Sequence, residues 1–201
     1  MRNNLKKLHL GCGGKKLDGW INVDIEASCS PDEIVDLEKF PWPWQDDSVD
    51  HILMSHVLEH LGERRDIYLQ IIQELYRVCV DGALIEIHVP HPRHDHFLWD
   101  PTHVRAITAE GLLMFDKQTN LQWIQENAAN TPLGIYLGVD FRIDKVNYQP
   151  DPVIQKQLES GEISASVFHT LLRTQNNICQ QIDIDWRVVK NNESAPREIV
   201  V

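Results

Sequence analysis

A short run of glycines follows the first apolar segment of the chain, at positions 10–14, which read Leu-Gly-Cys-Gly-Gly. Glycine has no Cβ atom, so a turn of this composition lets a ligand approach the backbone and meet its N–H groups. Any tight turn can be rich in glycine, and the run alone does not identify a ligand. Asp24 ends the next apolar segment, where an acid in a doubly wound sheet can hydrogen-bond both hydroxyls of a ribose.

A second group of reactive side chains is a cluster of histidines, because five of the ten histidines lie between positions 88 and 103. An imidazole titrates near neutral pH and can accept a proton from an O–H or N–H group. We expect His103 and His91 to be the catalytic histidines, with His103 the first choice for a general base. Histidines beside prolines also commonly sit in loops as satisfied hydrogen-bond donors.

The same cluster permits a metal site. His91, His94 and His96 offer three imidazoles, with Asp95 and Asp100 close by, although no standard zinc spacing is met. A metal-dependent enzyme centred on these histidines is therefore an alternative. The pair Glu59-His60 could also reach the site or could simply cap a helix.

The elements that must position these residues follow an α/β pattern with a parallel sheet over the first ninety residues. Strands are expected over residues 7–10, 20–23, 33–36, 51–55 and 83–89. A helix is expected over residues 63–79, where apolar side chains recur at three- and four-residue steps. Asp81-Gly82 is expected to stop this helix and turn the chain into the next strand.

Beyond residue 90 the pattern changes to a long histidine-rich active-site loop, residues 88–108, which we expect to pack over a pocket. A helix over 108–115, a strand over 136–148, a helical insertion over 151–178 broken near Gly161 and a closing strand over 182–188 are expected to follow. We expect one domain over residues 1–190 and a flexible tail over 191–201.

The composition of the chain disfavours some classes of binding partner. Lys plus Arg total 19 against 30 Asp plus Glu, and the net charge of −11 disfavours nucleic acid and anionic membranes. The four cysteines form no CxxC pair and no apolar run approaches ~20 residues, so reduced thiols and a cytoplasmic protein without a membrane segment are expected. A small-molecule acceptor is the expected partner, and the 151–178 insertion could be a lid, a substrate cover or a homodimer contact.

Over residues 7–90 the order of these features strongly resembles the order found in class I S-adenosylmethionine-dependent methyltransferases. After the glycine turn and Asp24 come Asp36 with a Pro-aromatic pair, Asp-Asp-Ser-Val-Asp at 46–50 and Ser-His-Val-Leu-Glu-His-Leu at 55–61. The resemblance implies a Rossmann-like seven-stranded sheet in the order 3-2-1-4-5-7-6 that is mostly parallel, with an antiparallel last strand.

The resemblance also implies S-adenosyl-L-methionine as cofactor and S-adenosyl-L-homocysteine as its product. The glycine turn would lie against the methionine portion, Asp24 would hold the ribose, Asp36 and the Leu37 backbone would meet the adenine, and the end of the fourth strand would line the cofactor. The implied cofactor residues are Leu10, Gly11, Cys12, Gly13, Asp24, Asp36, Leu37, Ser55 and His56.

One spacing departs from the dinucleotide pattern. Gly11 and Asp24 are 13 positions apart, against ~20 in the dinucleotide fingerprint, so the usual first helix must be shortened or replaced by a turn. The chain resembles a compact subgroup of predicted methyltransferases, uncharacterised or polysaccharide-associated, that read Leu-Gly-Cys-Gly, Gly-Trp and Asn-Val-Asp. We expect methyl transfer to a small-molecule or sugar-like acceptor, with the metal-dependent enzyme and a non-catalytic cofactor-binding module as alternatives.

Overall fold

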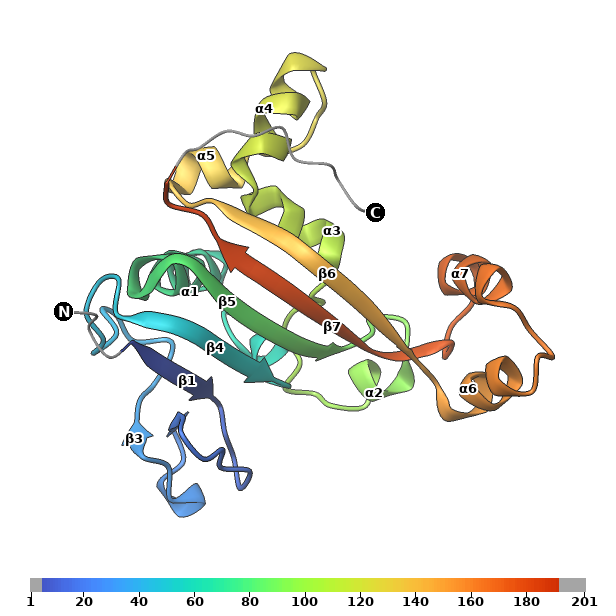
Figure 1. Cartoon of the computed structure of the whole chain (residues 1–201), viewed down its shortest axis with the longest axis horizontal. Coiled ribbons are helices and arrows are strands. Elements are labelled where there is room, and N and C mark those ends of the chain that lie inside the picture. Colours follow the sequence, from blue (N-terminus) through green and yellow to red (C-terminus); the bar gives the residue numbers. More distant parts are fainter. Residues whose placement is uncertain (1–4, 192–201) are drawn as a thin grey trace.

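In the computed structural model, which describes residues 5–191, seven strands form one sheet in the order β3-β2-β1-β4-β5-β7-β6 (Figure 1). The strands are β1 Lys6–Leu10, β2 Ile21–Asp24, β3 Glu33–Ile34, β4 Val49–Ser55, β5 Cys79–Pro90, β6 Phe141–Pro150 and β7 Cys179–Val188. The strands from β3 to β5 pair in parallel, and β7 is antiparallel to both β5 and β6. The predicted strand order and the antiparallel last strand are confirmed.

The helices fall mainly in the second half of the chain. They are α1 Arg65–Val78, α2 Asp95–Leu98, α3 Ala109–Leu112, α4 Lys117–Gln125, α5 Leu133–Leu137, α6 Pro152–Glu159 and α7 Ala165–Thr174. Three 3-10 helices, η1 Ala27–Cys29, η2 Leu58–His60 and η3 Leu113–Phe115, complete the set. No helix in residues 5–191 is long and apolar enough to cross a membrane.

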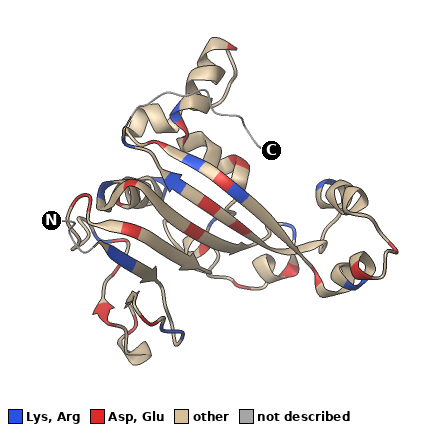
Figure 2. Cartoon of the chain, viewed as in Figure 1, with Lys and Arg blue, Asp and Glu red and all other residues tan. Residues whose placement is uncertain are grey.

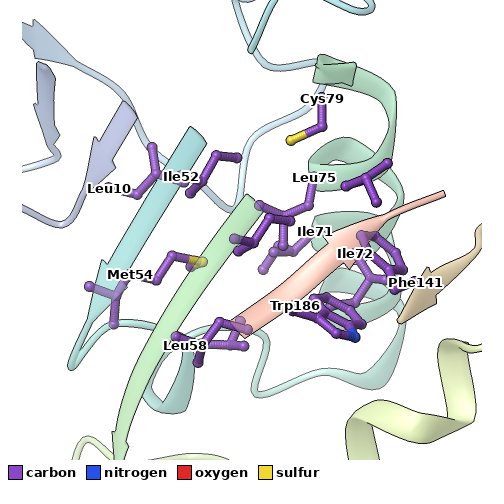
Figure 3. Close-up of a cluster of buried hydrophobic side chains, with 14 of the residues drawn as sticks. Leu10, Ile52, Met54, Leu58, Ile71, Ile72, Leu75, Cys79, Phe141 and Trp186 are labelled. Atoms are coloured by element: carbon purple, nitrogen blue, oxygen red, sulfur yellow. The ribbon is translucent and has the colours of Figure 1, made fainter. Parts of the chain in front are cut away.

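The core lies between the sheet and α1. Ile71, Ile72 and Leu75 of α1 are fully buried, and Figure 3 shows them facing the strands beside Phe141 and Trp186. The rings of Phe141 and Trp186 stack with their centroids 3.8 Å apart. The amphipathic stripe that predicts α1 is therefore the stripe that it buries.

The two faces of the sheet differ in burial. On β5, Ile85 and Ile87 are fully buried, whereas Leu84, Glu86 and His88 are only partly buried. In β7 the same alternation leaves the charged residues on the less buried face, and Figure 2 shows charged positions along β5, β6 and β7. We call this face the open face. Between β1 and β3 the described chain contains no α-helix, only η1. The helices that usually cover this face of a parallel sheet are therefore absent from these connections.

Two expected boundaries are wrong by four residues or more. Asp81-Gly82 does not turn the chain between α1 and the next strand, because β5 begins at Cys79 and contains both residues. Gly82 has φ +78° where the pairing of β4 with β5 shifts register, so its left-handed conformation serves an irregularity in the ladder. The strand expected from residue 136 starts at Phe141, since residues 133–137 form α5 and Gly138 ends that helix with φ +71°.

The helical insertion over 151–178 is present as α6 and α7, with Gly161 at φ +76° in the break between them. It has a small apolar cluster of its own, formed by Ile154, Phe168 and Ile178. The tail expected over 191–201 lies outside the described residues except for Asn191.

Candidate functional site

The glycine turn closes the carboxyl end of β1 in a conformation that needs glycine. Gly11 and Gly13 have φ +64° and +51°, and a Cβ atom on Gly11 would lie 2.4 Å from Val57 Cγ2. The Cys12 N–H donates to the Val23 carbonyl at 3.0 Å, which ties the turn to β2. Cys12 is 4% exposed, and burial and the charge of Asp24 raise the pKa of its thiol, so this side chain packs as a small apolar group.

Asp24 connects this turn to the chain after β2. Its Oδ2 accepts from the Gly13 N–H at 2.8 Å and its Oδ1 accepts from the Glu26 N–H at 2.9 Å. Each carboxylate oxygen has a second lone pair, so the side chain can still accept from a ligand. The glycine turn and Asp24 are therefore in direct contact at the carboxyl ends of β1 and β2.

A polar cluster replaces the missing first helix, and the sequence pattern did not reveal it. The Asn22 side-chain oxygen accepts from the Leu17 N–H at 2.7 Å, and Asp32 Oδ2 accepts from both the backbone and the side-chain N–H groups of Asn22. Lys16 Nζ donates to Asp32 Oδ1 at 2.6 Å. These bonds, with the one from Lys16 foremost, lower the pKa of Asp32 to about 2. Asp32 therefore fixes the path of the short connection from β1 to β2.

The residues expected beside the adenine follow β3. Asp36 Oδ1 accepts from the Glu38 N–H at 3.0 Å, and Leu37 is 7% exposed with its carbonyl accepting from the Trp42 indole at 3.1 Å. Asp36 remains partly exposed next to a buried backbone turn. This segment lies at the carboxyl side of β3, on the same edge of the sheet as Asp24.

At the end of β4, Ser55 is partly buried and His56 adopts φ +56°, which is unusual for a residue other than glycine. The Gln181 amide donates to Asp183 Oδ1 at 2.7 Å, which leaves the Gln181 oxygen to accept from His56 Nε2 at 3.0 Å. His56 Nδ1 lies 3.4 Å from Glu59 Oε1. The Glu59 carboxylate raises the pKa of His56, against the opposing effect of burial.

A pocket of about 650 Å³ opens beside His56 at this sheet edge. Gln181 lines it from β7, and Pro90 lines it from the end of β5. The histidine-rich loop contributes His96, Trp99, Asp100 and His103. The loop thus borders a pocket as expected, although Trp99 itself is 71% exposed.

His103 and His91 differ in position and in protonation. His103 Nδ1 lies 2.7 Å from the Phe97 carbonyl, which can only accept, so Nδ1 carries a proton and the neutral ring has its lone pair on Nε2. His91 Nδ1 accepts from the Arg93 N–H at 3.2 Å, and burial, followed by the charge of Arg93, lowers the pKa of His91. Among the described residues that line the pocket, His103 is present and His91 is not.

Of the three histidines considered for a metal, the His91 and His94 rings have hydrogen-bond partners, and the His96 ring lies against the rings of His94 and Trp99. His94 Nδ1 accepts from the His96 N–H at 3.1 Å, and His94 Nε2 lies 3.3 Å from Asp151 Oδ2. Within residues 5–191, the group whose ligand atoms all lie within 4.8 Å of one another is instead Glu59, His60 and His103. The structure therefore brings together the Glu59-His60 pair and a loop histidine.

No protein-family model and no curated protein matches this chain. Among solved structures, a SAM-dependent methyltransferase from Archaeoglobus fulgidus superposes with a TM-score of 0.57 at 20% identity, over 92% of this chain and 87% of that one. A SAM-dependent methyltransferase from Methanosarcina mazei gives 0.53 at 13% identity over 95% of each chain.

The fold is also shared with a protein of a different named activity. The [4+2]-cyclase SpnF superposes with a TM-score of 0.54 at 16% identity, over 93% of this chain and 75% of that one. Likeness at this level concerns the fold, and activity has to be argued from the site. The chain has the Rossmann-like fold of class I S-adenosylmethionine-dependent methyltransferases.

Proposed function

We propose that this protein transfers a methyl group from S-adenosyl-L-methionine to a small-molecule acceptor held in the pocket beside His56. The observation that carries the proposal is the glycine turn, held by Asp24 at the carboxyl ends of β1 and β2. Ligands of open α/β sheets bind outside these strand ends, and the pocket lies at the ends of the neighbouring strands β4 and β5.

The cofactor would be held by backbone and by acids. The N–H groups of the glycine turn and the free lone pairs of Asp24 suit the methionine and ribose portions, and Asp36 with Leu37 suits the adenine. Leu10, Cys12, Ser55 and His56 complete this proposed surface. The missing first helix does not weaken it, because Asn22 and Asp32 hold the short connection that follows the glycine turn.

The chemistry asks little of the protein beyond placement. A sulfonium is a good leaving group, so the protein must align the acceptor with the methyl group and accept a proton from an O–H or N–H nucleophile. His103 suits the second task because the neutral ring, with Nδ1 donating to the Phe97 carbonyl, has its lone pair on Nε2 and the residue lines the pocket. His91 suits it less, since its Nδ1 lone pair is used by the Arg93 N–H.

The pocket favours a small polar acceptor, including a sugar-like one. Imidazoles, the Gln181 amide and the Asp100 carboxylate offer hydrogen bonds to hydroxyl groups, and Trp99 offers an exposed aromatic surface for a sugar ring. The net charge of −11 disfavours a nucleic-acid acceptor.

Calorimetric titration with S-adenosyl-L-homocysteine tests the cofactor site. Asp24→Asn keeps one oxygen for the Gly13 N–H, replaces the oxygen that accepts from the Glu26 N–H with an NH2 group, and removes the charge. It should weaken binding roughly 10–100-fold, the value of charge-assisted hydrogen bonds. Asp18→Asn, at an exposed position of the same connection, is the matched control and should bind as the wild type does. Absence of binding by the wild-type protein, or equal affinity in Asp24→Asn, would contradict the proposal.

A further inference from the structure

We propose that Glu59, His60 and His103 form a binding site for a divalent transition-metal ion at the wall of the pocket. Glu59 and His60 belong to η2, and His103 belongs to the histidine-rich loop. One ligand atom from each residue lies within 4.8 Å of the other two. A tetrahedral ion with bonds of ~2.1 Å has its ligand atoms ~3.4 Å apart, so binding requires these atoms to approach one another by up to about 1.4 Å.

The Glu59 carboxylate is the first reason for this assignment. Glu59 is fully buried, and neither of its carboxylate oxygens has a hydrogen-bond partner among the described residues. Its contact with His56 is an ion pair at 3.4 Å without the geometry of a hydrogen bond. Buried carboxylates are costly unless they are paired with a charge, hydrogen-bonded or bound to a metal. The ion pair with His56 meets this need in part, and a bound metal ion would give the carboxylate oxygens the direct partner that they lack.

The protonation of the two histidines is the second reason. The Thr102 hydroxyl donates to Asp100 Oδ1 at 2.6 Å, so its oxygen accepts from His60 Nδ1 at 2.9 Å. His103 Nδ1 donates to the Phe97 carbonyl. In their neutral forms both rings therefore carry the proton on Nδ1 and the lone pair on Nε2, with the Nδ1–H fixed by an oxygen as in metal-bound histidines.

The local fold holds these three residues together. The Glu59 carbonyl accepts from the backbone N–H groups of Val104 and Arg105 at 2.9 and 3.2 Å, which ties η2 to the residues after His103. The Arg105 guanidinium lies over the Tyr68 ring at 4.1 Å and donates to the Gly62 carbonyl at 2.8 Å. His60 and His103 are thus placed by backbone pairing, with their ring centroids 4.6 Å apart.

The donor set indicates the class of ion. Two imidazoles and one carboxylate suit Zn²⁺, Mn²⁺, Fe²⁺ or Co²⁺ better than Ca²⁺ or Mg²⁺, which prefer oxygen ligands. Three protein ligands leave coordination positions open, and His103 lines the pocket, so an oxygen of the acceptor could take one of them. In the ion-bound form His103 Nε2 holds the ion, and His103 accepts a proton only in the ion-free form. The site does not depend on methyl transfer.

Titration of the full chain with Co²⁺, after removal of metals by a chelator and without any cofactor, tests the proposal. We expect one Co²⁺ per chain, with the visible absorption of a protein-bound ion, and competition by Zn²⁺. Glu59→Gln and His60→Gln should each weaken binding at least about tenfold. His169→Gln, which changes an exposed histidine on α7, should bind as the wild type does, and so should His96→Gln.

Thermal unfolding separates binding from folding. Because Glu59 has no hydrogen-bond partner among the described residues, metal-free Glu59→Gln should unfold at or above the wild-type temperature, and Zn²⁺ should raise the unfolding temperature of the wild type only. If Glu59→Gln does not fold, Thr102→Val takes its place in the test. This variant leaves all three ligands in place but removes the oxygen that holds His60 Nδ1, and it should weaken Co²⁺ binding. The proposal would be overturned if the wild type does not bind Co²⁺, or if both His60→Gln and Thr102→Val bind Co²⁺ as tightly as the wild type does. It would also be overturned if His96→Gln is the one variant that loses Co²⁺ binding. Failure to bind S-adenosyl-L-homocysteine with Co²⁺ binding intact would overturn only the proposed function.

Discussion

Gly11 is the residue at which the conformation of the cofactor turn is most constrained. Its φ of +64° and the 2.4 Å that would separate an added Cβ from Val57 Cγ2 both exclude a larger residue without rearrangement. Gly11→Ala should lower the free energy of unfolding by roughly 2–4 kcal/mol, from backbone strain and overpacking together. Gly14→Ala, three positions on, has φ outside the left-handed region and no atom within 4 Å of the added Cβ, and should change stability by less than about 0.5 kcal/mol.

Urea denaturation of both variants checks this prediction, and equal stability of the two would show that the turn relaxes around a side chain. At this scale the sequence was informative where partners are close in the chain. Gly13 and Asp24 are joined by one hydrogen bond across a short connection, and their closeness at one edge of the sheet could be inferred from their order in the sequence. Glu59 and His103 meet only because two backbone bonds bring distant segments together, and no local pattern predicts such a contact.

Among the elements, α1 holds the segment that follows the proposed adenine site. Arg77, near its end, forms two bonds of 2.7 Å with Glu74 and also donates to the carbonyls of Trp42 and Trp44. Arg77→Lys cannot reproduce this planar arrangement and should lower the free energy of unfolding by roughly 1–3 kcal/mol. Arg64→Lys, in the exposed pair with Asp66 at the other end of α1, should cost less than about 0.5 kcal/mol.

Chemical denaturation of the two lysine variants measures the difference, and similar losses would mean that the Arg77 cluster contributes no more than a surface pair. The sequence predicted α1 because its apolar positions recur at helical spacing along its whole length. It could not assign Gly82, because a chain reversal and a bulge inside a strand both favour a left-handed residue. Nor could it place α5, since five residues are too few to show a helical period.

For the molecule as a whole, the main consequence of the short β1 to β2 connection is the open face of the sheet. A parallel sheet is usually covered on both sides, and its strands then read as continuous apolar runs. Here β5 alternates, and the open face carries His51 against Glu86 at 2.5 Å, with Asp183 accepting from Gln149 and Gln181. The alternation in β7 was visible in the sequence, but the loss of one helical layer follows only from the short spacing between Gly11 and Asp24 taken together with the structure.

Adjacent residues of β5 allow a direct test of this asymmetry. Leu84 and Ile85 are both apolar and lie on the same strand, but Ile85 is fully buried under the helices while Leu84 is partly exposed on the open face. Ile85→Ala should lower the free energy of unfolding by about 2–5 kcal/mol, since it leaves a cavity in the core. Leu84→Ala should cost about 1 kcal/mol or less, because the lost side chain is already in contact with water. Urea denaturation of both variants at two protein concentrations tests this prediction. Equal losses of unfolding free energy in the two variants, with a denaturation midpoint that rises with protein concentration, would mean that a second copy covers the open face in solution.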